Sequence, residues 1–192
     1  MLPEIIKQFN WLDILIILIF IRICFVSLKT GFLVEIFKFL GIVTAVYCSL
    51  HYYTTLSDFL QARLGLKTIP LEFLDFVSAI LLALLGCLLF FAVRVGFERI
   101  IKMETTPKIS QAGGLLLGLG RALLLVSLVT FFLAISSVDY FKKIAVSSYS
   151  GSKVIDIAPN TYTWLWNSIG SRFMTEEEYN KLIPKIQKEL KE

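Results

Sequence analysis

Charged residues, and the residue types that most often bind metals or act as nucleophiles, are scarce in this chain. Only 18% of its 192 residues are charged, and it has one histidine and three cysteines. Cys24, Cys48 and Cys87 lack CxxC spacing and have no histidine cluster beside them, so we interpret them as inert buried thiols. The histidine, His51, ends an apolar run, where we expect an interfacial residue. No motif for a nucleotide, a metal or a nucleophile is visible, so we predict a non-enzyme without metal or cofactor.

What the sequence has in abundance is long apolar runs. The chain is 56% hydrophobic with a mean hydropathy of +0.74, which is too apolar for one soluble core. A helix needs about 20 apolar residues to cross roughly 30 Å of hydrocarbon. We therefore predict an all-α integral membrane protein, with a four-helix transmembrane domain over residues 1–141 and a polar, amphipathic tail over residues 142–192. The expected spans are residues 11–28, 32–51, 73–97 and 113–135.

The net charge of +4 comes from lysines and arginines spread through loops and tail. That distribution suits an anionic membrane surface better than a nucleic-acid groove, and no basic patch with interleaved aromatic residues is present. The lipid bilayer is therefore the expected partner, and nucleic acid is not.

Ionisable residues interrupt the apolar runs, although a charge deep in lipid costs at least about 2.5–3.5 kcal/mol. Only Lys29 and Thr30 precede Gly31 in the short link between the first two runs, so we expect a tight helical hairpin with Gly31 at its turn. Arg22 then lies about 12 Å down the first helix, with Glu35 and Lys38 about 7 and 12 Å down the second. We expect these three residues to form a partly buried polar cluster; the alternative is that the long side chains snorkel to the interface.

Asp13 lies nine positions before Arg22, which places it on the opposite face of the first helix. The two residues therefore cannot share a partner. A structural role at the interface and a functional role in a polar groove are both open for Asp13.

Small residues recur every four positions in the fourth run, at Gly114, Gly118 and Ala122. Such a stripe lets a neighbouring helix approach closely. Arg121 lies beside it, so we expect its guanidinium to point into the bundle or an oligomer interface, with Glu35 or Asp13 as the first candidate partners. The alternative is a packing motif whose arginine escapes to water.

The connecting segments also carry signals. Residues 58–72 are polar and contain Gly65 and Pro70, which favours a loop. Trp164 and Trp166 favour a helix in the headgroup zone. In the final segment, Thr175 and Glu178 have capping-box spacing, and Pro184 should kink or restart a helix that we expect to be solvated or bound to a surface.

The pattern resembles the colicin V production protein (CvpA) family over about the first 160 residues. The resemblance rests on Trp11-Leu12-Asp13, on Thr30-Gly31-Phe32 followed by Glu35, on the glycine-rich stretch from Gly114 to Arg121, and on the serine-bearing segment before Pro159. It implies a small bacterial inner-membrane protein with four spans and a role in colicin V production, or toxin biosynthesis, and envelope stress tolerance, without an established biochemical activity. The chain departs from the family pattern at Thr30, Val34, Ser110, Gln111 and Ala122.

Two functional hypotheses follow. In the first, the protein supports bacteriocin production or export and envelope homeostasis without catalysis, by assembling with itself or with other membrane proteins. In the second, it is a small transporter or channel whose polar centre is formed by Arg121, Glu35 and Asp13. Basic residues crowd the short loop around residues 98–110, so we expect that loop inside the cytoplasm and both termini outside it.

Overall fold

The structure, a computed structural model, describes residues 9–64, 69–100, 107–174 and 177–190. In these ranges the regular structure is helical throughout, as predicted for an all-α protein. The four long helices are α2 (Trp11–Thr30), α3 (Phe32–Leu64), α4 (Leu71–Ile100) and α5 (Pro107–Ile135). The shorter elements are α6 (Asp139–Ser147), α7 (Gly151–Val154), α8 (Ile157–Leu165), the π-helical turn η1 (Trp166–Gly170), α9 (Ser171–Phe173) and α10 (Leu182–Glu189).

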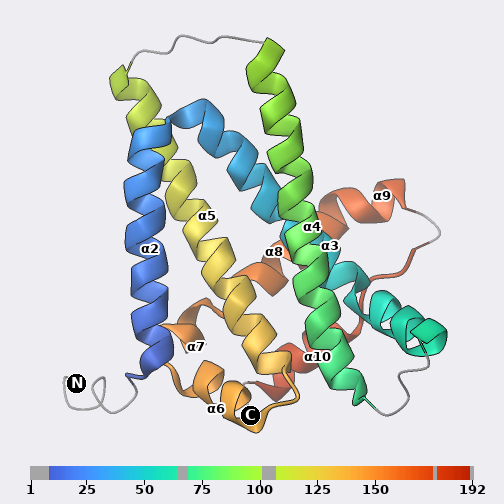
Figure 1. The fold of residues 1–192 in the computed structure, drawn as a ribbon. Coiled ribbons are helices and arrows are strands. Elements are labelled where there is room, and N and C mark those ends of the chain that lie inside the picture. The colour runs from blue at the N-terminus through green and yellow to red at the C-terminus, as the bar shows by residue number, and fades with distance from the viewer. Residues whose placement is uncertain (1–8, 65–68, 101–106, 175–176, 191–192) are drawn as a thin grey trace.

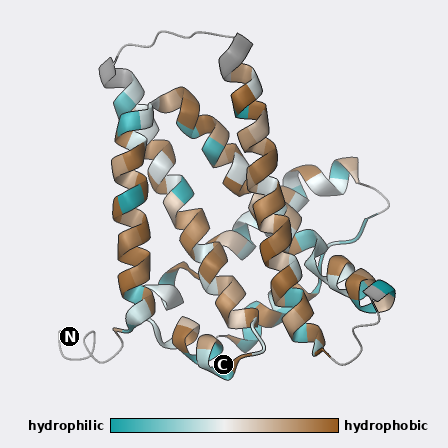
Figure 2. Ribbon diagram, in the orientation of Figure 1, coloured by the Kyte–Doolittle hydropathy of each residue, from teal (hydrophilic) through white to brown (hydrophobic). Residues whose placement is uncertain are grey.

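The four long helices have the length and composition needed to cross a membrane, which confirms the prediction of four transmembrane helices. Figure 2 shows them as mostly hydrophobic ribbons, whereas hydrophilic residues are concentrated in the shorter elements. Many large apolar side chains on these helices are exposed, among them Leu18 and Ile21 of α2 and Leu84 and Leu88 of α4. An apolar outer surface of this kind is what a hydrocarbon solvent requires.

Helix α5 lies at the centre of the bundle. Helix α2 packs against α5, and α3 packs against both α5 and α4 (Figure 1). Helix α4 is the least buried of the four, whereas half of the most apolar stretch of α5 is buried inside the bundle. The bundle therefore places α2 and α4 on the outside, and α3 and α5 carry its interior.

The turn between α2 and α3 is formed by Gly31, as predicted. Its φ of 77° lies in the left-handed region that side chains disfavour. A Cβ atom at this position would lie 2.6 Å from Oγ of Ser110. That same Oγ accepts a hydrogen bond from the backbone N–H of Phe32 at 3.1 Å. The start of α5 therefore supports the hairpin turn directly.

The prediction of a loop over residues 58–72 is wrong for its first half, because α3 continues to Leu64. The segment from Asp58 to Leu64 contains neither glycine nor proline, so nothing in it breaks a helix before Gly65. The hydroxyl of Ser57 lies within hydrogen-bond distance of the carbonyl oxygen of Thr54 and of Asp75, and its single proton can serve either acceptor, so this part of α3 is tied to α4. A polar composition without glycine or proline therefore does not end the helix here.

The C-terminal tail packs into the same hydrophobic core as the long helices. Ala158 and Tyr162 of α8 are fully buried. Ser127 of α5 accepts a hydrogen bond from the backbone N–H of Ala158 at 2.7 Å and donates one to the carbonyl oxygen of Ile155 at 3.2 Å. Figure 1 shows α8 crossing behind α5. This part of the tail is thus held by the bundle through both apolar and polar contacts.

Three expectations for the tail concern its tryptophans, its last helix and the capping box at Thr175. Trp164 is 62% exposed, but Trp166 is only 8% exposed, so the two indoles do not share one interfacial environment. Helix α10 starts at Leu182 with Pro184 in its first turn, as expected for a restarted helix, but its Ile183 is fully buried in the core rather than solvated. Thr175 lies outside the described residues, so the capping-box expectation is not addressed.

Candidate functional site

Glu35, in the first turn of α3, is a fully buried charged group within the spans. Its position follows from the hairpin, because its backbone N–H donates to the carbonyl oxygen of Gly31 at 3.2 Å. The side chain has no exposed surface. Its Oε1 accepts a hydrogen bond from Thr30 Oγ1 at 2.7 Å and another from Lys38 Nζ at 2.6 Å. One carboxylate therefore joins the end of α2 to two turns of α3.

Arg121 of α5 completes this cluster. Its Nη2 lies 3.1 Å from Oε2 of Glu35, and its side chain is 17% exposed. Among the described residues, neither Oε2 of Glu35 nor Nε of Arg121 has a hydrogen-bond partner, so the contact is an ion pair without the alignment of a hydrogen bond. In lipid such a pair lowers the cost of both charges. We call Thr30, Glu35, Lys38 and Arg121 the polar cluster.

Arg22 lies outside the polar cluster, and the expected contact with Glu35 is wrong. The buried face of α2 contains Ile16, Ile23 and Ser27. Arg22 is one position before Ile23, which turns it by about 100° from that face. Its side chain is exposed. Arg22 has the depth along the hairpin to reach Glu35, but the direction of its side chain around the helix prevents the contact.

The small-residue stripe of α5 faces α2. A Cβ on Gly114 would lie 2.9 Å from the carbonyl oxygen of Ser27, and a Cβ on Gly118 would overlap the side chain of Ser27. Ala122 is fully buried further along α5. The stripe therefore allows two helices of the same chain to approach closely, and that approach places Arg121 beside Glu35.

Asp13 lies away from the polar cluster, at the beginning of α2. It forms a capping box with Asn10, whose backbone N–H donates to Oδ2 of Asp13 at 2.9 Å. Its Oδ1 accepts hydrogen bonds from Ser148 Oγ at 2.8 Å and from the backbone N–H of Ser150 at 2.7 Å. These contacts give Asp13 a structural role, since the carboxylate attaches the segment before α7 to the first span.

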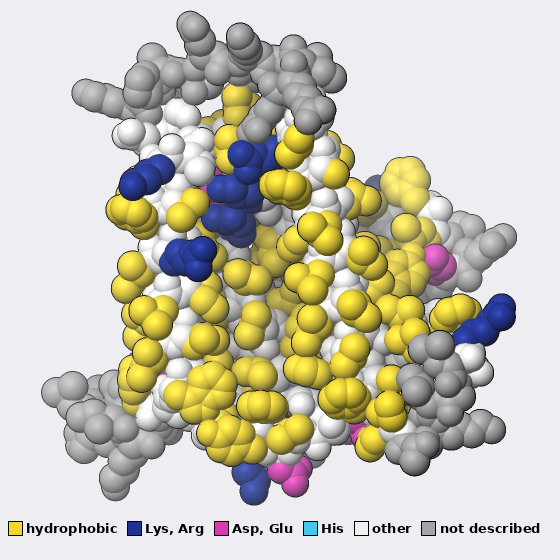
Figure 3. All heavy atoms as spheres, in the orientation of Figure 1, with side chains coloured by type: hydrophobic (Ala, Val, Ile, Leu, Met, Phe, Trp, Pro, Cys, Tyr) yellow, Lys and Arg dark blue, Asp and Glu magenta, His cyan; other side chains and the backbone are white. Residues whose placement is uncertain are grey.

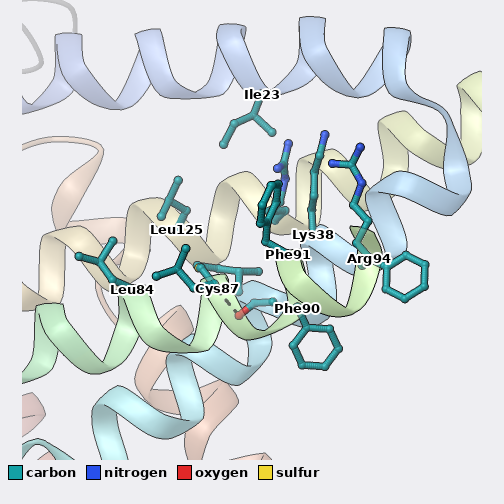
Figure 4. A pocket seen from close by; sticks show the side chains of 13 residues that line it. Ile23, Lys38, Leu84, Cys87, Phe90, Phe91, Arg94 and Leu125 are labelled. Carbon is teal, nitrogen blue, oxygen red and sulfur yellow. Dashed lines mark hydrogen bonds between the residues drawn. The ribbon is translucent and has the colours of Figure 1, made fainter. Parts of the chain in front are cut away.

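A pocket of about 540 Å³ opens beside the polar cluster, with walls from all four spans. Ile23, Leu84 and Leu125 supply part of its apolar wall, and Lys38, Arg94 and Arg121 also line it. Figure 4 shows the nitrogen atoms of Lys38 and Arg94 near one another at one end, with Leu84 and Leu125 toward the other. Figure 3 shows basic side chains gathered at the upper part of this face, above a largely apolar surface. The pocket is therefore amphipathic along its length.

A second polar centre, which the sequence did not reveal, surrounds His51. The ring is buried, with Nε2 at 2.9 Å from Oε2 of Glu177 and Nδ1 at 2.9 Å from the hydroxyl of Tyr162. The ring also stacks on Trp166 at 5.0 Å. The interpretation of His51 as an interfacial residue is therefore wrong. Its partners lie in the distant tail, and no local spacing marks them.

The hydrogen-bond directions in this centre can be assigned in part. A carboxylate only accepts, so Nε2 of His51 donates to Glu177. Burial is the main reason that the pKa of Tyr162 is raised above its ordinary value. The hydroxyl therefore keeps its proton, and it accepts a hydrogen bond from the backbone N–H of Asn180 at 3.1 Å. Together with Tyr52, which donates to Glu177, these groups attach the tail to α3.

In the part of the chain that the structure describes, no group of three or more histidine, cysteine, aspartate and glutamate residues could hold a metal ion. The family model for the colicin V production protein matches residues 12–177. The chain belongs to the colicin V production protein family. No curated protein and no solved structure matches it. The family match begins beside Asp13 and ends at Glu177, so it covers the polar cluster and also the His51 centre, beyond the 160 residues that carried the resemblance.

Proposed function

We propose that this member of the colicin V production family is a non-enzymatic component of the bacterial inner membrane. It supports toxin production or export and envelope homeostasis by assembling with itself or with other membrane proteins. The observation that carries the proposal is the engagement of the buried Glu35 carboxylate by Thr30, Lys38 and Arg121. A carboxylate held by three neighbours, one in each of α2, α3 and α5, stabilises the helix arrangement and is poorly placed for proton or group transfer.

The assembly surface in this proposal is the outer face of α4. Leu81, Leu85 and Leu89 on this helix are 45%, 59% and 56% exposed. They recur every four positions, so they form one apolar stripe along the helix. Lipid covers such a stripe in a monomer, and a second membrane protein can replace that lipid without exposing polar backbone.

The proposed orientation places the turn between α2 and α3 in the cytoplasm. Lys29, Lys38 and Arg94 lie toward this end of the bundle, and basic residues are enriched on the cytoplasmic side of inner-membrane proteins. The N-terminal and C-terminal ends then lie on the opposite side. Labelling of single cysteines placed at Lys29 and at Lys142 with an impermeant reagent in intact cells tests this, with Lys142 expected to react and Lys29 to be protected.

A small transporter is the alternative function. The amphipathic pocket beside Arg121 is the observation that favours it, since a basic end inside the bilayer can serve as a binding site on a transport path. The two functions differ in one measurable property, which is solute movement by the purified protein.

The test combines complementation with flux. A toxin-producing strain that lacks the gene is complemented with the wild-type chain or with Leu85→Arg, and toxin activity in the medium is measured. Purified protein in liposomes is assayed in parallel. Restored toxin release, its loss in Leu85→Arg at normal protein level, and background flux support the assembly role. Flux that disappears in Arg121→Ala while the fold survives favours the transporter and contradicts the proposal.

A further inference from the structure

The pocket beside the polar cluster is open toward the surroundings of the bundle. Three residues of its wall on α4, Leu84, Leu88 and Phe91, are 55%, 59% and 58% exposed. Its volume of about 540 Å³ is within the roughly 300–1,000 Å³ of ligand pockets. In a bilayer, this opening faces hydrocarbon, so an acyl chain can enter it from the side.

Among the residues that the structure describes, the charged ones that line this pocket are all basic. Lys38 and Arg121 share a single carboxylate, that of Glu35, which is fully buried beneath them. Two cations on one carboxylate leave positive charge at the pocket wall, and Arg94 from α4 brings a further guanidinium to the same wall (Figure 4). Arg121 also has a buried Nε–H without a hydrogen-bond partner among the described residues. The basic end is therefore suited to an oxyanion.

The depth of the basic end matches a lipid headgroup. Lys38 lies seven residues after the turn at Gly31, which is about 10 Å along the helix. The side chain of Arg121 is directed toward the start of α5, because Cβ bonds tilt toward the N-terminus of a helix. Both cations thus extend toward the membrane surface at the hairpin end, while Leu84 and Leu125 line the deeper, apolar part.

We infer that this pocket binds one anionic phospholipid, with its phosphate on Lys38, Arg94 and Arg121 and an acyl chain along Leu84 and Leu125. The inference goes beyond the proposed assembly role and does not require it. A zwitterionic lipid with the same chains fits the apolar wall equally but carries no net negative charge for the basic end. Preference for the anionic headgroup is therefore the property that identifies the site.

The first experiment measures lipid retention on the full-length protein by native mass spectrometry. The probes are phosphatidylglycerol and phosphatidylethanolamine with identical acyl chains. We expect preferential retention of phosphatidylglycerol and about fivefold weaker binding in Arg94→Gln, the size typical of one basic group at an anionic surface. Arg22→Gln is the matched control, since Arg22 lies at the same end of the bundle but outside the pocket, and its affinity should equal that of the wild type.

The second experiment tests the apolar part with a pair of adjacent leucines. Leu84 lines the pocket and Leu85 does not, although both are more than half exposed on α4. Leu84→Trp should fill the pocket and lower phosphatidylglycerol retention several-fold, whereas Leu85→Trp should leave it unchanged. Circular dichroism and size-exclusion profiles establish that each variant folds. If Arg94→Gln does not fold, Lys38→Gln takes its place.

Several results overturn the inference. Equal retention of the two lipids would mean that the headgroup charge is not recognised. Equal losses in Arg94→Gln and Arg22→Gln, or in Leu84→Trp and Leu85→Trp, would indicate lipid bound over the whole surface rather than in the pocket. Displacement of phosphatidylglycerol by inorganic phosphate alone would identify free phosphate as the ligand. Complementation of toxin release is read separately, so failure of lipid binding leaves the proposed assembly role standing.

Discussion

Glu35 of α3 and Arg121 of α5 form an ion pair of 3.1 Å inside the membrane-spanning bundle. The pair connects two helices that already pack against each other, and Lys38 brings a second cation to the same carboxylate at 2.6 Å. In hydrocarbon each of the two charges alone would carry a large free-energy cost, and pairing lowers the cost of both. The pair thereby fixes which faces of α3 and α5 meet.

Removing the carboxylate charge should destabilise the bundle. Glu35→Gln leaves Arg121 partly buried without its counter-ion, which we expect to lower the free energy of unfolding by about 3 kcal/mol. The measurement is reversible unfolding by sodium dodecyl sulfate in mixed micelles, followed by tryptophan fluorescence. Arg22→Gln removes an exposed charge on α2 and should change the free energy by less than about 0.5 kcal/mol.

A double-mutant cycle separates the pair from its surroundings. If the pair acts as a unit, Glu35→Gln combined with Arg121→Gln should cost at least about 1 kcal/mol less than the sum of the two single variants. Strict additivity of the two changes would show that the 3.1 Å contact contributes no coupling.

Close packing of α2 on α5 should depend on Gly118. A Cβ at this position would overlap Ser27, whose Oγ is also hydrogen-bonded to the carbonyl oxygen of Ile23. We expect Gly118→Ala to lower the free energy of unfolding by about 1–3 kcal/mol, because the two helices must separate. A Cβ on Gly96 meets no atom within 4 Å. Gly96→Ala is therefore the control and should be neutral or gain up to about 1 kcal/mol from helix propensity. Similar losses in both variants would mean that the close approach of α2 and α5 at Gly118 does not contribute to the free energy of unfolding.

Much of the fold was predictable because its signals are local. Each span is a continuous apolar run, the turn at Gly31 needs a residue that tolerates positive φ, and Glu35 and Lys38 are three positions apart on one helix face. The stripe from Gly114 to Ala122 likewise indicates a close helix contact, although it does not identify the partner helix.

The rest depended on which faces of the helices meet, which a single sequence does not specify. Arg22 has the depth to reach Glu35 but lies on the outer face of α2. His51 joins Tyr162 and Glu177 only because α8 and the segment after α9 return to α3. Such long-range contacts leave no periodic signal, so the sequence alone indicates a tail at the surface instead of in the core.

Asp13 should hold the tail segment around Ser150 in place. Asp13→Asn removes the charge at the start of α2 and replaces one of the two acceptor oxygens with a donor, at a cost of about 1–3 kcal/mol. Hydrogen exchange measured by mass spectrometry should show faster exchange of the Ser150 amide, which donates to Asp13 at 2.7 Å. Asp58→Asn, at an exposed position of α3, should leave that exchange rate unchanged. Unaltered exchange in Asp13→Asn would show that the segment is held by other contacts.

Docking of the tail on α3 should weaken in alkali through Tyr162. Burial raises the pKa of this hydroxyl, so the folded protein holds the phenolic proton more tightly than the unfolded chain, where a tyrosine has a pKa of about 10. The unfolded chain therefore loses its proton first, and the free energy of unfolding decreases as the pH rises above about 10.

Tyr162→Phe removes both the titrating group and its hydrogen bonds. Near neutral pH it should be less stable than the wild type by about 1–3 kcal/mol, because His51 and the backbone N–H of Asn180 lose their partner. Between about pH 9 and pH 11, around the ordinary tyrosine pKa, the difference from the wild type should shrink. The difference is measured from the free energies of unfolding across this pH range. Tyr140→Phe is the matched control, because it removes the hydroxyl of a side chain that is 60% exposed. Its free energy of unfolding should follow the wild-type curve. A constant difference between Tyr162→Phe and the wild type would show that Tyr162 keeps the same proton affinity in the folded and unfolded chain, and the alkaline weakening would then have another source.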